Sequence, residues 1–439
     1  MFLEYLPILL LFIFLFAGMP VAFALAISGA IGALQILGWS GAMGALSNIP
    51  YSTTASFTIV AIGMFILMAE IATQSGITTR LFRAANSLVG HYRGGLAVAT
   101  MLASAAFGTL SGSSIAAAAT MSRIAIPEML KRGYSKEFAA GTVSIAGTLA
   151  ILIPPSIPLI IFGIITETSI RKLLIAGMVP GIITVVIYML TITIWTRADK
   201  NAAPVMEVAA TLRERWDAIR YVWPFLLVIL AIFAALYTGA VTTTEASAVG
   251  VMAVLIIWLL LHRIPSAGLE PFTLSGFGDS LSRALNSTVM ILVLLIGAYI
   301  FSFYLILTGA SNTVESYITG LDWPPHAILA VVILLYIVLG MFMSQLEIMI
   351  LTLPFVFPII VNLGFDPIWM GIIVVKTIEI GLVTPPVGMN VFVVSSASKE
   401  VMPAQGFKGI TPFLIAEFAA LLLLIIFPEI VTFVPNLMQ

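Results

Sequence analysis

Residues 379–390 read EIGLVTPPVGMN and place two consecutive prolines in the middle of an apolar run that extends from residue 367 to residue 398. A proline lacks a backbone N–H and crowds the carbonyl four residues before it, so two in a row unwind a helix and leave carbonyl oxygens unpaired. Residues 153–158, IPPSIP, repeat this pattern inside the apolar run 138–165. In hydrocarbon such oxygens need another ligand. The two runs therefore predict two interrupted membrane helices with polar groups at the breaks.

The composition requires a membrane around these helices. Of the 439 residues, 61% are hydrophobic and 9% are charged, and the mean hydropathy is +1.14. Soluble domains carry about 25% charged residues, so a soluble protein is excluded and an all-α polytopic membrane protein is predicted. Twelve apolar runs are expected to form its membrane segments: 3–17, 20–38, 53–73, 93–130, 138–165, 173–196, 221–239, 245–262, 285–308, 325–362, 367–398 and 411–432.

Several classes of function are excluded by what the sequence lacks. The net charge is −1 without long basic or acidic runs, which argues against nucleic acid binding. There is no cysteine, and the three histidines are not at i, i+4 spacing, so a transition-metal site is not expected. No GxxxxGK[ST] phosphate loop occurs, so no nucleotide is expected. The first apolar run has no basic region before it, and we interpret it as a membrane span rather than a signal peptide.

Two of the runs, 93–130 and 325–362, are too long for one span, and each has small or polar residues at its middle. The first contains SGSS at residues 111–114, and the second contains Ser344 and Gln345. We expect each to form a re-entrant hairpin of helix, tip and helix. The positive-inside rule supports this, because with hairpins 15 of the 19 basic residues fall on one, cytoplasmic, face. These are Arg80, Arg83, Arg93, Lys131, Arg132, Lys136, Arg197, Lys200, Arg213, Arg215, Arg220, Arg263, Arg283, Lys399 and Lys408. Both termini are then outside, the first hairpin enters from the cytoplasm, and the second enters from outside.

An internal repeat relates the two hairpins and the two breaks. At an offset of 231 residues, Ser113 aligns with Ser344 and the prolines 154–155 align with 385–386. Single identities between apolar segments mean little, but a double proline in register is more specific. We assign residues 1–200 to a first repeat, 201–220 to a cytoplasmic linker helix, and 221–439 to a second, inverted repeat. Inverted repeats with interrupted helices indicate a secondary transporter and its binding site.

The tips and breaks carry the candidate chemistry. Carbonyl and hydroxyl oxygens at the breaks suit a dehydrated Na⁺, whereas the simpler explanation is a proline kink repaired by neighbouring helices. The SGSS tip offers hydroxyls and free N–H groups at a helix start, which attract an anion. Close packing of small residues explains that tip equally well.

Ionisable residues at membrane depth are further candidates: Glu70, Arg123, Glu245, Glu347, Lys376, Glu379 and Glu417. Lys376 and Glu379 are at i, i+3 spacing, so a mutual salt bridge is the simpler interpretation. Glu245 follows three threonines and is expected at a helix start. Arg123 reaches the cytoplasmic interface or pairs with a carboxylate of protein or substrate, and both alternatives stay open.

Four motifs together resemble a known family: residues 111–114 (SGSS), 126–134 (IPEMLKRGY), 153–156 (IPPS) and 379–390 (EIGLVTPPVGMN). They are similar to the large membrane subunit (M, DctM-like) of tripartite ATP-independent periplasmic (TRAP) transporters. The resemblance implies an elevator-type, Na⁺-coupled importer of organic acids in the bacterial inner membrane. It also implies two partners, a small four-helix membrane subunit (Q) and a soluble periplasmic binding protein (P).

The resemblance further implies where the ions and the substrate bind. One Na⁺ is expected between the first tip and the first break, with ligands from Ser111, Ser113, Ile153, Pro154 and Ser156. A second Na⁺ is expected at the other tip and break, with ligands from Ser344, Gly381, Thr384 and Val387. The substrate is expected between the tips and breaks, near Gly112, Ser114, Pro155, Pro386, Gly388, Asn390 and, outside the family motifs, Arg123.

Other functions make different demands on the sequence. An ion channel relies on symmetric rings or a filter, and a carrier that works without a binding protein remains an alternative. An intramembrane hydrolase needs a base beside Ser113, and the three histidines lie at segment ends. A purely structural scaffold subunit would not need two unwound helix segments at membrane depth. The substrate is left open among dicarboxylates, sugar acids, amino-acid-like compounds and sulfonates.

Overall fold

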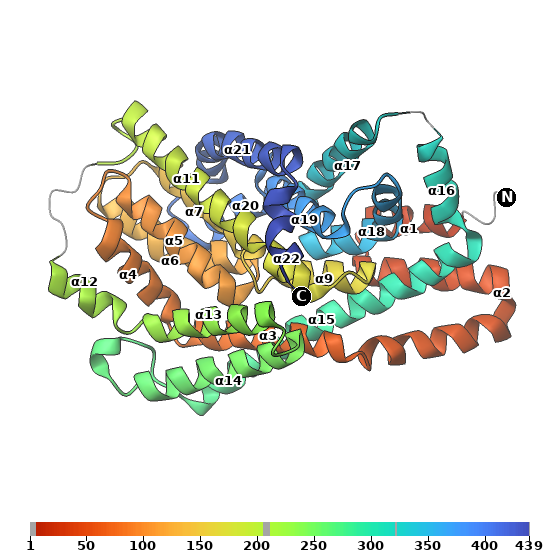
Figure 1. Ribbon diagram of the computed structural model, residues 1–439, viewed down its shortest axis with the longest axis horizontal. Helices are drawn as coiled ribbons and strands as arrows, with labels where there is room; N and C mark the ends of the chain where they lie inside the picture. The colour runs from red at the N-terminus through yellow and green to blue at the C-terminus, as the bar shows by residue number, and fades with distance from the viewer. Residues whose placement is uncertain (1–5, 205–210, 321–322, 439) are drawn as a thin grey trace.

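The computed structural model describes residues 6–204, 211–320 and 323–438, and every regular element in these ranges is a helix (Figure 1). The first half contains α1 (Leu6–Phe16), α2 (Val21–Thr54), α3 (Phe57–Gln74), α4 (Ile77–Val89), α5 (Gly95–Ser111), α6 (Ser114–Lys131), α7 (Lys136–Ala146), α8 (Leu149–Leu152), α9 (Ile157–Thr166), α10 (Ile170–Ala176) and α11 (Met178–Ala198). Helix α12 (Leu212–Ile219) lies between the halves. The second half contains α13 (Trp223–Thr238), α14 (Thr243–Leu261), a 3₁₀ turn (Pro265–Ala267), α15 (Leu274–Thr308), α16 (Ala310–Thr319), α17 (Pro325–Gly340), α18 (Gln345–Asn362), α19 (Pro367–Val383), α20 (Met389–Ser398), α21 (Pro403–Ile426) and α22 (Glu429–Asn436).

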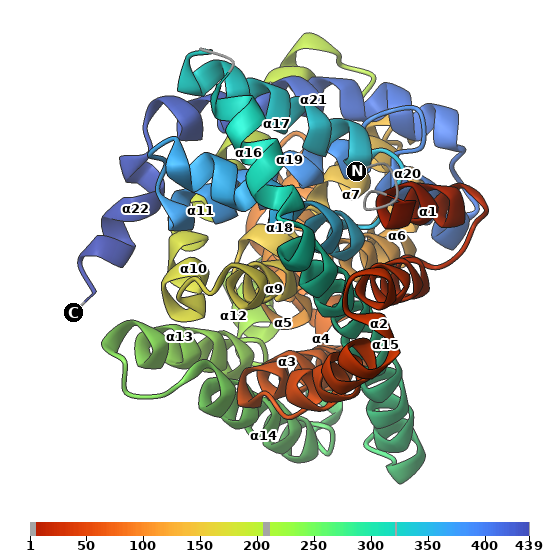
Figure 2. The same cartoon turned by 90° about the vertical axis from the view of Figure 1, so that its right-hand side faces the viewer.

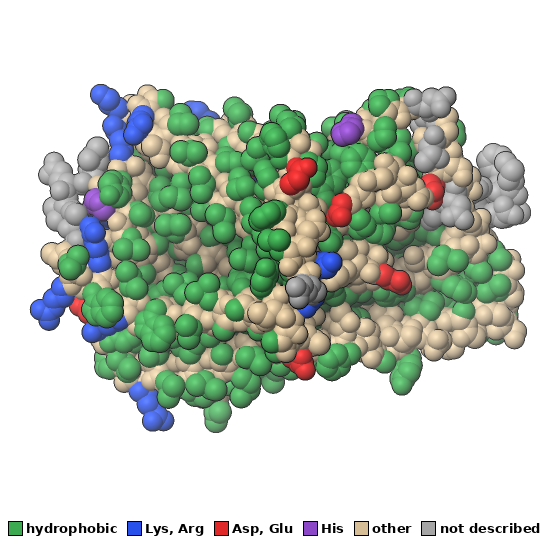
Figure 3. Space-filling view, viewed as in Figure 1, with side chains coloured by type: hydrophobic (Ala, Val, Ile, Leu, Met, Phe, Trp, Pro, Cys, Tyr) green, Lys and Arg blue, Asp and Glu red, His purple; other side chains and the backbone are tan. Residues whose placement is uncertain are grey.

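The helices are those of a polytopic membrane protein. Within the described ranges, seven are long and apolar enough to cross a membrane, or up to nine if each bent pair is one span. One bent pair is the first predicted broken helix, whose two arms, Lys136–Leu152 and Ile157–Thr166, differ in direction by 43°. Hydrophobic side chains are spread over the whole face shown in Figure 3, as on a lipid-facing surface. The prediction of an all-α polytopic protein is confirmed.

The element order repeats, and contacts are exchanged between the halves. Helix α2 packs on α15, and the corresponding pair, α14 and α3, pack on each other (Figures 1 and 2). The second helix of each hairpin contacts the broken helix of the other half, at the arm that follows the double proline. Helix α6 contacts α20, and helix α18 contacts α9. Helices α2, α3, α13, α14 and α15 form a layer on one side of the molecule, which we term the platform (Figure 2). The hairpins and broken helices lie together above it, and we term them the body.

Basic side chains gather at one end of the molecule, at the left of Figure 3. Arg80 Nη2 donates to the carbonyl of Ser266 at 2.6 Å, and Arg93 Nη2 donates to the carbonyl of Lys200 at 3.1 Å. Hairpin α5–α6 lies toward this end, and hairpin α17–α18 lies toward the opposite end (Figure 1). The arrangement agrees with hairpins that enter from opposite sides, and the assignment of the basic end to the cytoplasm stays a prediction.

Two predicted boundaries, those of α2 and α15, are wrong, because hydropathy detects the apolar part of a helix and not its ends. Helix α2 continues past residue 38 to Thr54, with Gly38 in a non-helical conformation inside it. Helix α15 begins at Leu274 rather than near 285, and its extension is stabilised by Arg283, whose Nε contacts Glu70 Oε2 at 2.7 Å. In the linker, the described helix covers only Leu212–Ile219, and residues 205–210 lie outside the described ranges.

Helix α12 has the features of a helix at the membrane surface. Thr211 and Glu214 form a reciprocal cap at its start. The backbone N–H of Thr211 donates to the Glu214 carboxylate at 2.7 Å and thereby lowers the pKa of Glu214. Leu212 and Trp216 are 85% and 67% exposed beside these polar groups. Such an amphipathic pattern suits the boundary between lipid and water.

Glycines set a very close contact between helix α7 of the body and helix α21. A Cβ on Gly409 would lie 1.8 Å from the carbonyl oxygen of Glu137, and a Cβ on Gly141 would lie 2.2 Å from the carbonyl carbon of Gly409. Both distances fall far inside van der Waals contact, so the two backbones approach this closely only because neither residue has a side chain.

We therefore expect Gly409→Ala to lower the thermal stability of the purified protein, because α21 must move away from α7 and overpacking costs about 1–3 kcal/mol. The matched control is Gly44→Ala on α2, where a Cβ would meet nothing within 4 Å. Thermal unfolding in detergent measures both variants. Equal melting temperatures for the two variants would contradict the close-approach account.

Candidate functional site

The tips of the two hairpins meet at one small cavity. The first tip, Gly112 and Ser113, joins α5 to α6, and the second tip, residues 341–344, joins α17 to α18. The cavity between them has a volume of about 190 Å³. Its walls are residues 112–115 of the first hairpin, 344–346 of the second, Ile157 and Pro158 of α9, Leu382 of α19 and Met290 of α15. Two segments separated by 231 residues in the sequence thus border the same space.

The first tip lies directly against the first break. Gly112 has a φ of +57°, and a Cβ there would lie 3.0 Å from the carbonyl oxygen of Pro155. Glycine is therefore required both by the left-handed backbone and by the close approach. Ser113 caps α6, with its Oγ accepting the N–H of Ala116 at 3.3 Å. The tip serines and the break form one polar region inside the body.

The first break separates α8 from α9. Its prolines supply no N–H, so the carbonyls of Ala150 and Ile151 lose their helical donors. Ser156 caps α9 by accepting the N–H of Leu159 at 3.4 Å. Both prolines and Ser156 are buried, so oxygens that lack partners here are shielded from water.

The second break separates α19 from α20 and is built differently. Thr384 Oγ1 donates to the carbonyl of Ile380 at 2.5 Å, and the Thr384 N–H donates to the carbonyl of Gly381 at 3.0 Å. Pro385 and Pro386 are exposed, unlike the prolines of the first break. The two breaks are equivalent in sequence but differ in access.

The second hairpin packs on the second break through glycines. A Cβ on Gly381 would lie 2.6 Å from the Cα of Gly340, at the end of α17. At the tip itself, Ser344 donates to Glu347 Oε2 from its N–H at 3.0 Å and from its Oγ at 2.7 Å. Glu347 therefore places a carboxylate at the start of α18, whereas α6 has no acid in its first turn. The two tips differ in charge.

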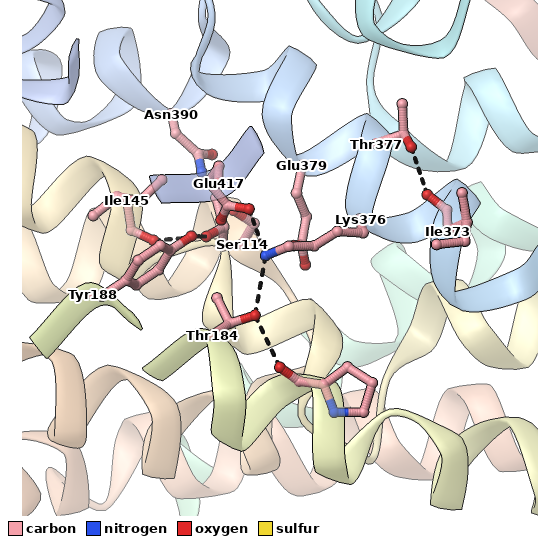
Figure 4. Close-up of polar contacts among 12 residues, drawn as sticks. Ser114, Ile145, Thr184, Tyr188, Ile373, Lys376, Thr377, Glu379, Asn390 and Glu417 are labelled. Atoms are coloured by element: carbon pink, nitrogen blue, oxygen red, sulfur yellow. Dashed lines mark hydrogen bonds and ion pairs between the residues drawn. The ribbon is translucent and has the colours of Figure 1, made fainter. Parts of the chain in front are cut away.

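One hydrogen bond ties the first tip to the second break. Asn390 Nδ2 donates to Ser114 Oγ at 2.5 Å (Figure 4). It also donates to the carbonyl of Ser144 at 3.5 Å. Asn390 is in the first turn of α20 and fully buried. Since α18 contacts α9 in the same way, each hairpin contacts both broken helices.

The predicted site residues fall into four groups. Ser111, Ser113, Ile153, Pro154 and Ser156 lie at the first tip and break. Ser344, Gly381, Thr384 and Val387 lie at the second tip and break. Gly112 and Ser114 line the cavity, as Ser113 and Ser344 also do, and Pro155 and Asn390 contact Gly112 and Ser114. Pro386, Gly388 and Arg123 are not among the lining residues; Arg123 is exposed on the side of α6. The roles of all these residues in binding stay predictions.

Seven of the eleven lining residues were not assigned to the site from the sequence, among them Gln345 and Met290. Gln345 is 8% exposed, and its Nε2 has no hydrogen-bond partner among the described residues. Its place beside the tip serine was the only signal for it. Met290 comes from the platform helix α15, and nothing in the sequence distinguishes it from a packing methionine.

These features define a class of membrane protein. Inverted repeats whose hairpin tips and interrupted helices converge on one site are the architecture of a secondary transporter.

The comparisons give the family. Residues 8–430 match the family described as "Tripartite ATP-independent periplasmic transporter, DctM component". The chain is 38% identical over 410 residues to the C4-dicarboxylate TRAP transporter large permease protein DctM of Pseudomonas aeruginosa, covering 93% of this chain and 91% of that one. It is 30% identical over 425 residues to the sialic acid TRAP transporter large permease protein SiaM of Vibrio cholerae, covering 96% of each.

Two further similar proteins are a longer permease and a transporter of known structure. The isethionate TRAP transporter permease protein DctMQ of Oleidesulfovibrio alaskensis is 32% identical over 424 residues, which are 96% of this chain and 64% of that protein. The crystal structure of the Alcanivorax borkumensis YdaH transporter shares the fold, with a TM-score of 0.63 at 14% identity, over 96% of this chain and 98% of that one. The chain belongs to the DctM family, the large permease subunits of TRAP transporters. It is a multi-pass inner-membrane transporter subunit and not an enzyme.

Gln345→Leu tests whether the cavity binds substrate. We expect a higher KM for the transported acid, on the order of 10-fold, because a buried donor without a partner among the described residues is lost from the wall of the cavity. The half-saturating Na⁺ concentration should change little, since Gln345 is outside the predicted sodium ligands. Initial uptake rates at varied substrate concentration measure the effect. An unchanged KM would show that the substrate binds elsewhere.

Proposed function

We propose that this chain imports a small organic acid anion by sodium-coupled, electrogenic symport. It works with a small four-helix membrane subunit and receives its substrate from a periplasmic binding protein. The observation that carries the proposal is the convergence of two hairpin tips and two interrupted helices on one cavity of about 190 Å³.

Sodium suits the oxygens at the two breaks. Carbonyls freed by the double prolines, together with hydroxyls of Ser111, Ser156 and Thr384, supply hard ligands without thiolate or imidazole. No cluster of three or more His, Cys, Asp or Glu side chains that could hold a metal ion occurs within the described ranges. A monovalent cation held by neutral oxygens is the simplest fit to such a donor set.

The first tip is the better place for the anion. Residues 113–115 at the start of α6 line the cavity, and a helix start favours negative charge. The start of α18 already has the Glu347 carboxylate, which favours a cation there instead. We therefore propose that the anionic substrate and the second cation bind at opposite walls of one cavity.

The size of the cavity favours a small acid. Pockets for drug-sized ligands measure about 300–1,000 Å³, and this cavity has about 190 Å³. The relatives carry names that refer to C4-dicarboxylates, sialic acid and isethionate, which are all acids. We propose a substrate of the size of a C4-dicarboxylate or a short sulfonate rather than a sugar acid.

The two layers of the fold suit an elevator movement. The body contains both tips and both breaks, so it can carry the complete site as one unit. The platform contributes one cavity residue, Met290, and contacts the body mainly through a few helices such as α15 against α18 and α3 against α5. Movement of the body along the platform would expose the site to one side of the membrane at a time.

The membrane potential can drive such a cycle. Each net positive charge that moves inward gains about 2.3 kcal/mol per 100 mV. At least two Na⁺ with a monoanion such as a short sulfonate, or at least three Na⁺ with a C4-dicarboxylate dianion, move one net positive charge inward, which is sufficient for concentrative uptake without a nucleotide.

Reconstitution tests the proposal. The chain and its small subunit are placed in liposomes, with binding protein and a labelled C4-dicarboxylate or short sulfonate outside. We expect uptake with an inward Na⁺ gradient and not with K⁺. Thr384→Val and Ser113→Ala should raise the half-saturating Na⁺ concentration by on the order of 10-fold or more, since each removes a group near a charged ligand. Thr238→Val, at an exposed position outside the site, is the control.

The alternatives predict different results. A carrier that works without a binding protein would transport at the same rate when that protein is omitted. A channel would pass ions without saturable, substrate-dependent uptake. Equal uptake in Na⁺ and K⁺ would refute the assignment of sodium to the breaks.

A further inference from the structure

A buried ionic cluster lies behind the second break. Lys376 and Glu379 of α19 meet Glu417 of α21, and all three side chains are at most 1% exposed (Figure 4). Lys376 Nζ lies 2.5 Å from Glu417 Oε2 and 3.6 Å from Glu379 Oε2. The i, i+3 pair expected from the sequence is thus present, but the nearer partner comes from another helix.

The cluster continues into α11. Lys376 Nζ donates to Thr184 Oγ1 at 3.2 Å, and it lies 5.8 Å from the centre of the Tyr188 ring. That distance is within the range of a cation–π contact. Lys376 therefore contacts α11 and α21 as well as Glu379 on its own helix.

Tyr188 connects this cluster to the first broken helix. Its hydroxyl is 3.1 Å from Thr148 Oγ1, and Thr148 Oγ1 also donates to the carbonyl of Ile145 at 2.7 Å. Thr148 directly precedes α8, and the first break follows the last residue of that helix, Leu152. Lys376 precedes Thr384, the first residue of the second break, by two helical turns. Thr148, Tyr188 and Lys376 thus form a continuous route between the two breaks.

The internal repeat shows that the ionic cluster is not needed to pack the fold. At the offset of 231, Lys376 and Glu379 correspond to Ile145 and Thr148, and at 232, Glu417 corresponds to Val185. The first half packs the same positions without charge. Buried ion pairs rarely add stability over well-packed apolar residues, so stability alone does not explain the charges of the second half.

We propose that Thr148, Tyr188 and Lys376 are positioning residues that couple the two breaks, so that a cation bound at one favours a cation at the other. The inference rests on the proposed sodium coupling. A cation at the second break fixes the end of α19 and, through it, the position of Lys376. Lys376 and Tyr188 then hold the hydroxyl of Thr148 and the start of α8. Coupling of this kind is reciprocal, so occupancy of the first break stabilises the second equally.

The Hill coefficient for Na⁺ in the liposome assay tests this proposal. We expect a value above 1 for the parent and a value near 1 for Tyr188→Phe, because only the hydroxyl that reaches Thr148 is removed. The half-saturating Na⁺ concentration should rise about 5-fold or more, the usual range of coupling between sites, while substrate KM at saturating Na⁺ is retained. Thr148→Val removes the other partner of the same hydrogen bond and should give the same result.

A matched control lies in the second hairpin. Tyr336 is equally buried and accepts a hydrogen bond from Thr352 Oγ1 at 3.0 Å, but this pair joins α17 to α18 and not the two breaks. Tyr336→Phe should keep the parental Hill coefficient. Lys376→Met should lower the Hill coefficient. Lys376→Arg should lower it less, because this variant keeps a positive charge near Glu417.

The outcomes separate this inference from the proposed function. If the parent is cooperative and both hydroxyl variants keep its Hill coefficient, the coupling route is refuted while sodium symport stands. If Tyr336→Phe loses cooperativity to the same extent as Tyr188→Phe, the effect is general loosening and the route is also refuted. If uptake by the parent does not depend on Na⁺, both the proposed function and the coupling fail.

Discussion

Backbone carbonyls at the two double prolines have to find partners other than backbone N–H groups, and much of the structure follows from that requirement. Water is absent at membrane depth, so the partners must come from protein or from a bound ion. The hairpin tips bring hydroxyls and helix starts to the breaks, and glycines such as Gly112 and Gly381 permit the approach. The interrupted helices, the re-entrant hairpins and the cavity therefore depend on one another.

The same arrangement gives the two halves different tasks. The first break is buried and faces a helix start without an acid, whereas the second is exposed at its prolines and faces a tip that has Glu347. An anion at the first tip and a cation at the second tip can therefore share one cavity, although the two halves repeat the same sequence pattern. The ionic cluster on α19 and α21 adds to this difference, since the first half has uncharged residues at the equivalent positions.

Local chemistry made much of this predictable. Double prolines, tip serines and the repeat offset identify the breaks and hairpins because each acts on its own segment of backbone. The capping role of Glu245 was likewise visible, and Thr242 Oγ1 donates to Glu245 Oε2 at 2.9 Å. Glu417 as the nearer partner of Lys376, and Met290 as a wall of the cavity, depend on which helices pack together, and i, i+3 spacing does not contain that information. Hydropathy also missed the ends of α2 and α15, where charged and small residues continue the helix beyond the apolar run.

Protection of introduced thiols tests most directly whether both tips border one site. The chain has no cysteine, so Ser113→Cys and Ser344→Cys each create a single target for a small maleimide. Na⁺ and substrate together are expected to slow the labelling of both variants, whereas Ser47→Cys on the exposed part of α2 should be labelled at an unchanged rate. Protection of only one tip, or of neither, would contradict a shared site between the two hairpins.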